Sequence, residues 1–202
     1  MVPHRILLLL FFLSVINAQI ALPTFQGIHK PQSVSASCDQ SVTYSFSDRG
    51  WYTSSGTHNS TNNNVIVGSY YRNWFTFDIS GFSGTACTIT LRLELELFNG
   101  SSGNYNLYDI STGHDDLVAS SSGSSGVTIY NDLGTGNSYG SVSLTSSDNN
   151  STIEIALNDQ AITDFNSESS GWFSVGGDWT GSVYIRFGSG PSDTFSQLVI
   201  TY

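Results

Sequence analysis

The stretch Ile89–Leu97 reads ITLRLELEL and carries the clearest structural pattern in the chain. Its apolar residues occupy every second position, and Thr90, Arg92, Glu94 and Glu96 lie between them. Successive side chains of a β-strand point to opposite faces of the sheet, so a strand here has one apolar and one polar face. A helix would instead scatter the charges around its circumference. The stretch therefore predicts a half-buried strand.

The same alternation recurs along most of the chain after Cys38. Clusters of Gly, Ser and Asn separate the apolar runs, as turns between short strands require. Only Asp159–Asn166 has helical spacing. About ten short strands and one short helix predict an all-β fold, and one polar face per strand favours an antiparallel, jelly-roll-like β-sandwich. The expected strands cover residues 42–46, 65–67, 73–77, 89–97, 105–110, 127–130, 139–144, 153–157, 172–175, 183–187 and 198–202.

Residues 1–18 have the pattern of a secretory signal peptide, with Arg5, an apolar run at Ile6–Ile16 and a small residue, Ala18, at the end. The run of about 11 residues is shorter than the ~20 that cross a bilayer. A buried N-terminal helix is the alternative. We expect residues 19–37 to form a linker or N-terminal arm and residues 38–202 to form a single domain. This organisation predicts a secreted protein, extracellular or at the cell surface, without membrane insertion.

The charge of the chain excludes several classes of partner. Its 202 residues include 16 Asp and Glu but only 6 Lys and Arg, a net charge of −10. Nucleic acids and anionic membranes are bound by clustered Lys and Arg, and Lys30 is the single lysine. We therefore expect no nucleic-acid partner. Charged residues make up only 11% of the chain, so Ser, Thr, Asn and Gly must keep the surface soluble.

Cys38 and Cys87 are the only cysteines in the sequence. An exported chain passes through an oxidising compartment, where the pair could form a disulfide. Two buried free thiols are the alternative. Closing a loop of about 50 residues would stabilise the fold by roughly 4 kcal/mol. The chain also contains four Asn-x-Ser/Thr sequences, which would be glycosylation sites in a glycoprotein: Asn59, Asn99, Asn149 and Asn150.

Three consecutive segments resemble secreted β-sandwich modules of the DNRLRE type. They are Asn64–Gly68 (NVIVG), Arg72–Ser80 (RNWFTFDIS) and Ile89–Leu93 (ITLRL). They follow the progression of those modules, which is valine-glycine, then arginine-x-x-phenylalanine-Asp-leucine-serine, then leucine-arginine-leucine. The resemblance spans roughly residues 42–202. It implies a jelly roll similar to the carbohydrate-binding domains of cell-surface and polysaccharide-active proteins.

Two shorter segments, Ser47–Tyr52 and Leu157–Asn158, are similar to parts of exported bacterial proteins of unassigned function. The motifs behind both resemblances are mainly core and turn positions, so they bear on the fold more than on the function. Within them, Arg72 is expected to form a structural ion pair with an acidic neighbour.

Two patterns match catalytic motifs in part. Gly136–Gly140 (GNSYG) fits G-x-S-x-G, but that motif needs a helix after it and a later histidine, and every histidine here comes earlier. Glu94 and Glu96 share one strand face about 6.5–7 Å apart, close to the spacing in inverting glycosidases. Charges on the wet face of an amphipathic strand explain this pair equally well. We expect no enzymatic activity, with a polysaccharide-cleaving enzyme as the weakest alternative.

Asp115 and Asp116 follow His114 in a polar segment that reads as a loop. Ca²⁺ takes about six to eight oxygen ligands, which such loops can supply. A structural Ca²⁺ is one hypothesis for this segment, and a plain solvated turn is the other. No other cofactor is expected.

Aromatic residues next to Gly-, Ser- and Asn-rich loops are the best candidates for a surface function. Their rings can stack on the C–H face of a sugar while polar neighbours bind its hydroxyls; core packing is the alternative for each. The sequence thus predicts a binding module for a polysaccharide or glycoprotein surface of the extracellular matrix. The alternative is an adhesive matrix protein that self-associates or binds Ca²⁺. The candidate ligand-binding residues are Trp51, Tyr52, Tyr70, Tyr71, Trp172 and Trp179.

Overall fold

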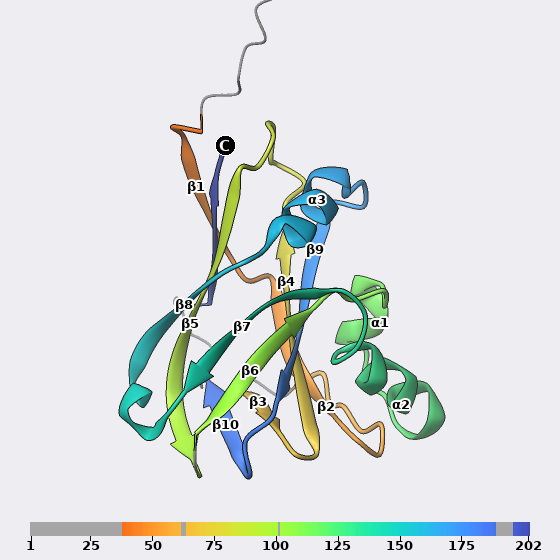
Figure 1. The fold of residues 1–202 in the computed structure, drawn as a ribbon. Helices are drawn as coiled ribbons and strands as arrows, with labels where there is room; N and C mark the ends of the chain where they lie inside the picture. The colour runs from red at the N-terminus through yellow and green to blue at the C-terminus, as the bar shows by residue number, and fades with distance from the viewer. Residues whose placement is uncertain (1–37, 62–63, 101, 189–195) are drawn as a thin grey trace, which may run out of the picture. The chain divides into compact units, whose positions relative to one another are not determined.

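Strands dominate the computed structural model of the chain, which describes residues 38–61, 64–100, 102–188 and 196–202 (Figure 1). The predicted signal peptide and N-terminal arm lie outside these residues. The strands are β1 (Ser41–Ser45), β2 (Asp48–Thr53), β3 (Val65–Gly68), β4 (Tyr71–Asp78), β5 (Thr88–Asn99), β6 (Gly103–Tyr108), β7 (Ser138–Leu144), β8 (Ser151–Ala156), β9 (Trp172–Trp179), β10 (Tyr184–Phe187) and β11 (Gln197–Thr201). The helices are α1 (His114–Val118), α2 (Gly123–Asp132), α3 (Asp159–Ser167) and a 3₁₀ turn, η1 (Ser146–Asp148).

The strands form one continuous, curled antiparallel sheet in the order β1-β11-β5-β10-β3-β4-β9-β6-β7, with β2 added to β4 and β8 added to β5. The all-β prediction is therefore confirmed. The hydrogen-bonded path is unbroken because the long strand β5 pairs with β8 and also with both β11 and β10. The division into two sheets of a jelly-roll sandwich stays a prediction.

The helical content exceeds the sequence prediction. The helix expected at Asp159–Asn166 is present as α3, and the Asn158 side chain caps it by accepting a hydrogen bond from the Ala161 N–H. The strand predicted at residues 127–130 is wrong, because this segment lies in α2. Its four residues are too few to separate a period of two from a period of 3.6. None of the described helices is long and apolar enough to cross a membrane.

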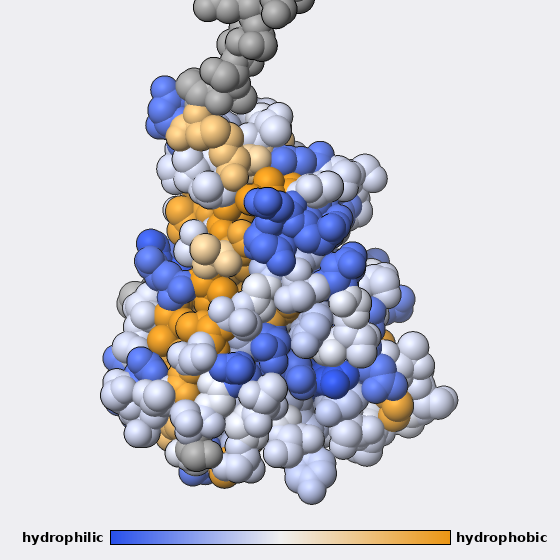
Figure 2. Space-filling view, in the orientation of Figure 1, coloured by the Kyte–Doolittle hydropathy of each residue, from blue (hydrophilic) through white to orange (hydrophobic). Residues whose placement is uncertain are grey.

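The main core lies on the apolar face of β5. Ile89, Leu91, Leu93 and Leu95 are almost completely buried there and pack in one cluster with Phe75 and Phe77 of β4. Each such side chain contributes about 1.5–3 kcal/mol on burial. Figure 2 shows apolar surface along the β5 and β8 side of this view, whereas the surface around α1 and α2 is mostly white to blue.

The opposite, wet face of β5 carries ion pairs between strands. Arg92 binds Glu154 of β8 at 2.7 Å, and Arg186 of β10 binds Glu96 at 3.1 Å. The polar half of the β5 pattern therefore stays at the surface and links neighbouring strands. The sequence-derived assignment of the two faces of this strand is confirmed.

A second, smaller core lies between the outer face of β2 and β4 and the helices α1 and α2. The strands contribute Tyr52 and Trp74 to this core, and the helical segment contributes Leu117 and Leu133. The Tyr52 hydroxyl lies within hydrogen-bond distance of the Asp116 and Leu117 carbonyls at the end of α1, 3.1 Å from each. This core fixes both helices against the sheet, on the side of β2 seen in Figure 1.

Cys38 and Cys87 form the predicted disulfide, with their Cα atoms 6.1 Å apart. The bond ties the chain ahead of β1 to the start of β5. Backbone hydrogen bonds between Gln40 and Tyr202 close the same end of the sheet. The disulfide therefore joins the first described residue to the central strand of the main core.

Replacing both cysteines by serine is expected to lower the free energy of unfolding by up to about 4 kcal/mol, because the unfolded chain regains the entropy of a 49-residue loop. Urea unfolding of the oxidised protein and of the Cys38→Ser/Cys87→Ser variant measures the difference. Wild-type protein under reducing conditions is the control and should unfold with the variant. Equal midpoints for the oxidised protein and the variant would contradict the expectation.

Arg72 forms the ion pair expected from the sequence, with its Nε 3.1 Å from Asp178. Its Nη1 also donates to the carbonyls of Tyr130 and Asn131 at the end of α2, and its guanidinium lies 4.6 Å from the Tyr130 ring centroid. Gly134 allows this arrangement, since a Cβ there would lie 2.3 Å from the Arg72 Nε. One mostly buried arginine thus attaches α2 to the sheet.

The Arg72→Met variant should lose roughly 1–3 kcal/mol of stability, because Asp178 and two helix carbonyls lose their donor. We also expect faster amide exchange in α2 than in β5. Arg92→Met is the matched control, because its pair with Glu154 is more exposed and should contribute only about 0–1 kcal/mol. Urea titration and hydrogen exchange check both variants, and an equal loss in the two would refute this role of Arg72.

Candidate functional site

The structure divides the six predicted aromatic residues between the surface and the interior. Tyr52 and Trp179 are 0% and 4% exposed, so their prediction as surface ligands is wrong. Tyr52 lies on the face of β2 that α1 covers. Trp179 packs edge-on against Phe98 and below Gly181, where a side chain would collide with its indole. The residues next to Tyr52 and Trp179 in the sequence do not reveal that both are buried, because α1 and Phe98, which cover them, lie far away along the chain.

Tyr70, Tyr71 and Trp51 come together at one end of the sheet. Tyr70 lies in the turn between β3 and β4 and is 68% exposed. Tyr71 is half-buried and meets Trp51 edge-to-face at 5.2 Å between ring centroids. The Trp51 Nε1 donates to the Asn64 Oδ1 at 3.0 Å, which fixes the indole. The pairing of β2 with β4 therefore produces an aromatic group with one freely exposed ring.

The turn that follows β9 completes this surface. Val183 is 37% exposed, and together with Tyr70 it accounts for the large apolar side chains exposed among the described residues. Both border a shallow depression of about 150 Å³. Gly68 permits the close approach of the two turns, since a Cβ there would lie 2.6 Å from the Val183 carbonyl oxygen. We call this surface the tyrosine rim; it consists of Ser69, Tyr70, Tyr71, Ser182, Val183 and Tyr184.

The tyrosine rim has no charged residue in its lining. It offers tyrosine rings, one valine and two serine hydroxyls. Aromatic faces with hydroxyl groups beside them suit a neutral ligand that has both apolar and hydroxyl surfaces. The rim is therefore uncharged, although the chain as a whole is acidic.

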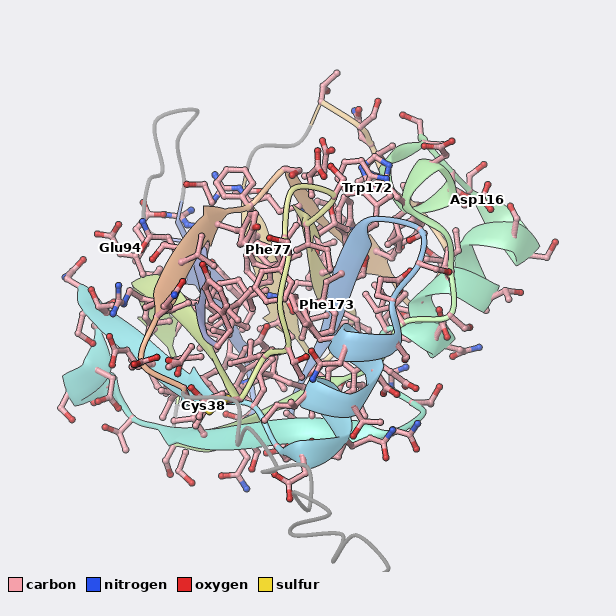
Figure 3. All side chains as sticks on the ribbon, turned by 90° about the horizontal axis from the view of Figure 1, so that it is seen from above. Cys38, Phe77, Glu94, Asp116, Trp172 and Phe173 are labelled. Carbon is pink, nitrogen blue, oxygen red and sulfur yellow. A yellow bond between two sulfur atoms is a disulfide. The ribbon has the colours of Figure 1, made fainter. Side chains whose placement is uncertain are left out.

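Trp172, the last of the predicted aromatic residues, lies elsewhere, at the start of β9. Its indole stacks on the His114 imidazole with ring centroids 3.7 Å apart and planes at 10°. The His114 Nε2 is 3.0 Å from Asp48 and its Nδ1 is 3.1 Å from Asp115. Figure 3 shows Trp172 and Phe173 at neighbouring positions of the same strand. No sequence pattern predicts the contact between His114 and Trp172, because the two residues belong to different elements.

A hollow of about 280 Å³ lies beside this stacked pair. Its walls come from the segment before α1, from β7, from α3 and the residues after it, and from β9. We call it the tryptophan recess. It is lined by Ile110, Ser111, Thr112, Gly113, His114, Tyr139, Asp164, Glu168, Ser170, Trp172, Phe173 and Ser174.

Tyr139 is the buried polar group of the tryptophan recess. Its hydroxyl lies 3.0 Å from the Asp164 Oδ2, to which it donates. Burial raises the pKa of the Tyr139 hydroxyl far above its usual value, and the negative charges of Asp164, Asp109 and Glu168 raise it further. The hydroxyl therefore stays protonated at any physiological pH and acts as a fixed donor.

The segment predicted as a calcium-binding loop has a different structure. Asp115 and Asp116 lie in the first turn of α1. Asp115 contacts His114, and the Asp116 carbonyl lies within hydrogen-bond distance of the Tyr52 hydroxyl. Within the described ranges, no group of three or more His, Cys, Asp and Glu side chains could hold a metal ion. The loop prediction is wrong, because the core under α1 turns this segment into a helix.

The two partial catalytic motifs occupy ordinary structural positions. Ser138 of the G-x-S-x-G match opens β7 after a turn, where its carbonyl accepts a hydrogen bond from the Asn158 Nδ2. Glu96 of the carboxylate pair is bound by Arg186 through two hydrogen bonds. Glu94 lies two residues before it on the same wet face of β5, and Figure 3 shows Glu94 at the edge of the molecule. The strand that follows Ser138 agrees with the strand predicted at residues 139–144.

All four predicted glycosylation positions are exposed, and three of them take part in hydrogen bonds. Asn59 accepts hydrogen bonds from Thr61, the third residue of its own Asn-x-Thr sequence. Asn149 accepts from the Phe98 N–H, and the Asn150 N–H donates to the Leu95 carbonyl. Asn99 ends β5 at the surface. Glycosylation at these asparagines stays a prediction.

The fold and these two surfaces define an all-β domain with an uncharged aromatic rim and an acidic recess. Comparison with models of known protein families gives no match. A search of curated proteins gives no significant match either. The resemblance to DNRLRE-type modules therefore stays a prediction, and the function has to be argued from the surfaces themselves.

His58 is a buried titratable residue that the sequence did not single out. It is 4% exposed, stacks on Tyr52 at 4.6 Å, and places its Nδ1 2.9 Å from the Trp51 carbonyl oxygen. Burial lowers the pKa of His58 below its usual 6.5, although the carbonyls of Trp51 and Val118 act in the opposite direction. The histidine is therefore held in its neutral form inside the second core.

Stability should fall as the pH drops through 6.5 towards 5, because the unfolded chain then binds a proton at His58 that the folded chain resists. Above pH 6.5 both states are neutral at this position and the effect vanishes. Urea unfolding at pH 7.5 and pH 5 of the wild type and of His58→Phe, which retains an aromatic ring next to Tyr52, measures this. The variant should lose less stability between the two pH values, and an unchanged difference would disprove the assignment.

Proposed function

We propose that the protein is a secreted, non-catalytic binding module that recognises a neutral carbohydrate through the tyrosine rim. One observation carries the proposal: Tyr70 and Val183, the large apolar side chains exposed among the described residues, border the same uncharged depression. Large apolar side chains that are exposed together often mark a binding surface. Serine hydroxyls beside the rings add the hydrogen-bonding groups that a sugar requires.

Secretion is supported by the disulfide, which is compatible with an extracellular protein. The apolar run that ends near Ala18 supports it as well. The exposed positions of Asn59, Asn99 and Asn149 also fit a glycoprotein. These observations favour a ligand met outside the cell, such as a polysaccharide or a glycoprotein glycan.

Tyr70 is expected to act as the stacking ring, and Tyr71, which lines the same depression, is held by its edge-to-face contact with Trp51. Trp51 is fixed by Asn64 and meets Tyr71 edge-to-face, so the rim is formed before any ligand arrives. A preformed surface loses little conformational entropy on binding. The shallow depression suits one face of a sugar ring better than a fully enclosed ligand.

The Tyr70→Ala variant should bind the recognised polysaccharide about 30-fold more weakly, because truncating an aromatic anchor costs about 2 kcal/mol. A panel of neutral polysaccharides in affinity gel electrophoresis identifies the ligand and measures the loss. Tyr108→Ala is the matched control, since Tyr108 is a half-buried tyrosine outside the rim.

Retention of the wild type with unchanged retention of Tyr108→Ala and loss for Tyr70→Ala supports the proposal. No retention on any neutral polymer, or equal retention of both variants, contradicts it. Concentration-dependent self-association that Tyr70→Ala abolishes, measured by light scattering, would instead assign the rim to contacts between copies of the chain.

A further inference from the structure

We infer that the tryptophan recess binds a compact organic ammonium ion, a ligand of a different class from the neutral sugar proposed for the rim. The inference does not rest on the proposed function, because the recess and the rim share no lining residue. It starts from the shape of the recess. A hollow of about 280 Å³ lies at the lower end of the range of small-molecule sites, so it admits a small group only.

The charge of the recess selects a cation. Asp164 and Glu168 line it, and the carboxylate of Asp109 lies close enough to act on Tyr139. The one basic side chain in the lining is His114, whose two ring nitrogens already face Asp48 and Asp115. Arg72, Arg92 and Arg186 bind carboxylates that lie outside the recess. An anion would therefore be repelled, and a cation attracted.

The carboxylates are arranged for an organic cation more than for a metal ion. Asp164 already receives hydrogen bonds from Tyr139 and Gln160, and Glu168 receives one from the Ser170 N–H. Within the described ranges, the acidic and histidine side chains do not gather into a metal-binding group. The carboxylates of Asp164 and Glu168 instead lie around the hollow without converging on one point, which suits an organic cation whose charge is spread over several atoms.

Aromatic rings supply the second element of such a site. Trp172 is the half-buried ring of the recess. Tyr139 and Phe173, each 3% exposed, form its floor and stack on one another at 5.8 Å between ring centroids. Aromatic faces attract ammonium groups by about 0.5–2 kcal/mol, and more strongly when water is excluded. The hydroxyls of Ser111, Thr112, Ser170 and Ser174 could bind N–H or O–H groups of the same ligand.

The direct test uses choline and 3,3-dimethyl-1-butanol, which have the same shape but differ in charge. Isothermal titration calorimetry with the full chain should show choline binding about tenfold or more tightly than the neutral alcohol, and weakening with salt. Glucosamine and N-acetylglucosamine form a second pair, which distinguishes a free ammonium ion from an amine carried on a sugar. A preference for the cation in either pair supports the inference. Equal binding within both pairs, or no binding of any of the four compounds, overturns it.

Variants locate the binding. Glu168→Gln and Asp164→Asn remove one charge each while keeping the shape, and each should weaken binding of the cation several-fold. Glu154→Gln is the matched control, because Glu154 is an exposed carboxylate on β8 that pairs with Arg92. Unchanged binding in Glu168→Gln and Asp164→Asn would refute the recess as the site.

The Tyr70→Ala variant separates this inference from the proposed function. It should bind choline as tightly as the wild type while losing the polysaccharide. Loss of choline binding in Tyr70→Ala would place the cation at the rim and refute the assignment to the recess. Retained choline binding without any polysaccharide binding would support the recess and contradict the proposed function alone.

Discussion

The strand β4 is buried on both of its faces, and the rest of the structure depends on this constraint. Phe75 and Phe77 point into the main core, whereas Trp74 lies in the second core under α1 and α2. A strand in this position needs cover on both sides, because exposed aromatic faces would cost several kcal/mol. The other strands of the curled sheet cover the face that carries Phe75 and Phe77. The helices α1 and α2, between β6 and β7, cover the face that carries Trp74.

The second cover has consequences far from Trp74. Its two helices are attached to the sheet by hydrogen bonds: the Tyr52 hydroxyl binds α1, and Arg72 binds the end of α2. Once α1 is fixed, His114 at its start reaches the strand β9 and stacks on Trp172. The recess beside this pair therefore depends on the packing that covers the outer face of β4.

The two candidate surfaces differ in the way they handle charge. The tyrosine rim contains no charged side chain, although the chain carries a net charge of −10. The tryptophan recess gathers Asp164 and Glu168 around aromatic rings. A neutral ligand gains little from the negative charges of the recess, and the rim offers a cation no carboxylate. One small domain therefore presents two chemically distinct surfaces.

The alternation of Ile89–Leu97 and its weaker repeats determined the all-β class and the two faces of β5, and the helical spacing of Asp159–Asn166 determined the position of α3, because these features depend on local periodicity. The cysteine pair and the ion pair of Arg72 also followed from residue types alone. Tertiary structure decided which aromatic residues are covered: Tyr52 and Trp179 are buried by distant segments, whereas Tyr70 is left exposed. It also turned residues 127–130 into helix and brought His114 to Trp172. Such outcomes depend on contacts between residues far apart in the chain, which no local pattern records.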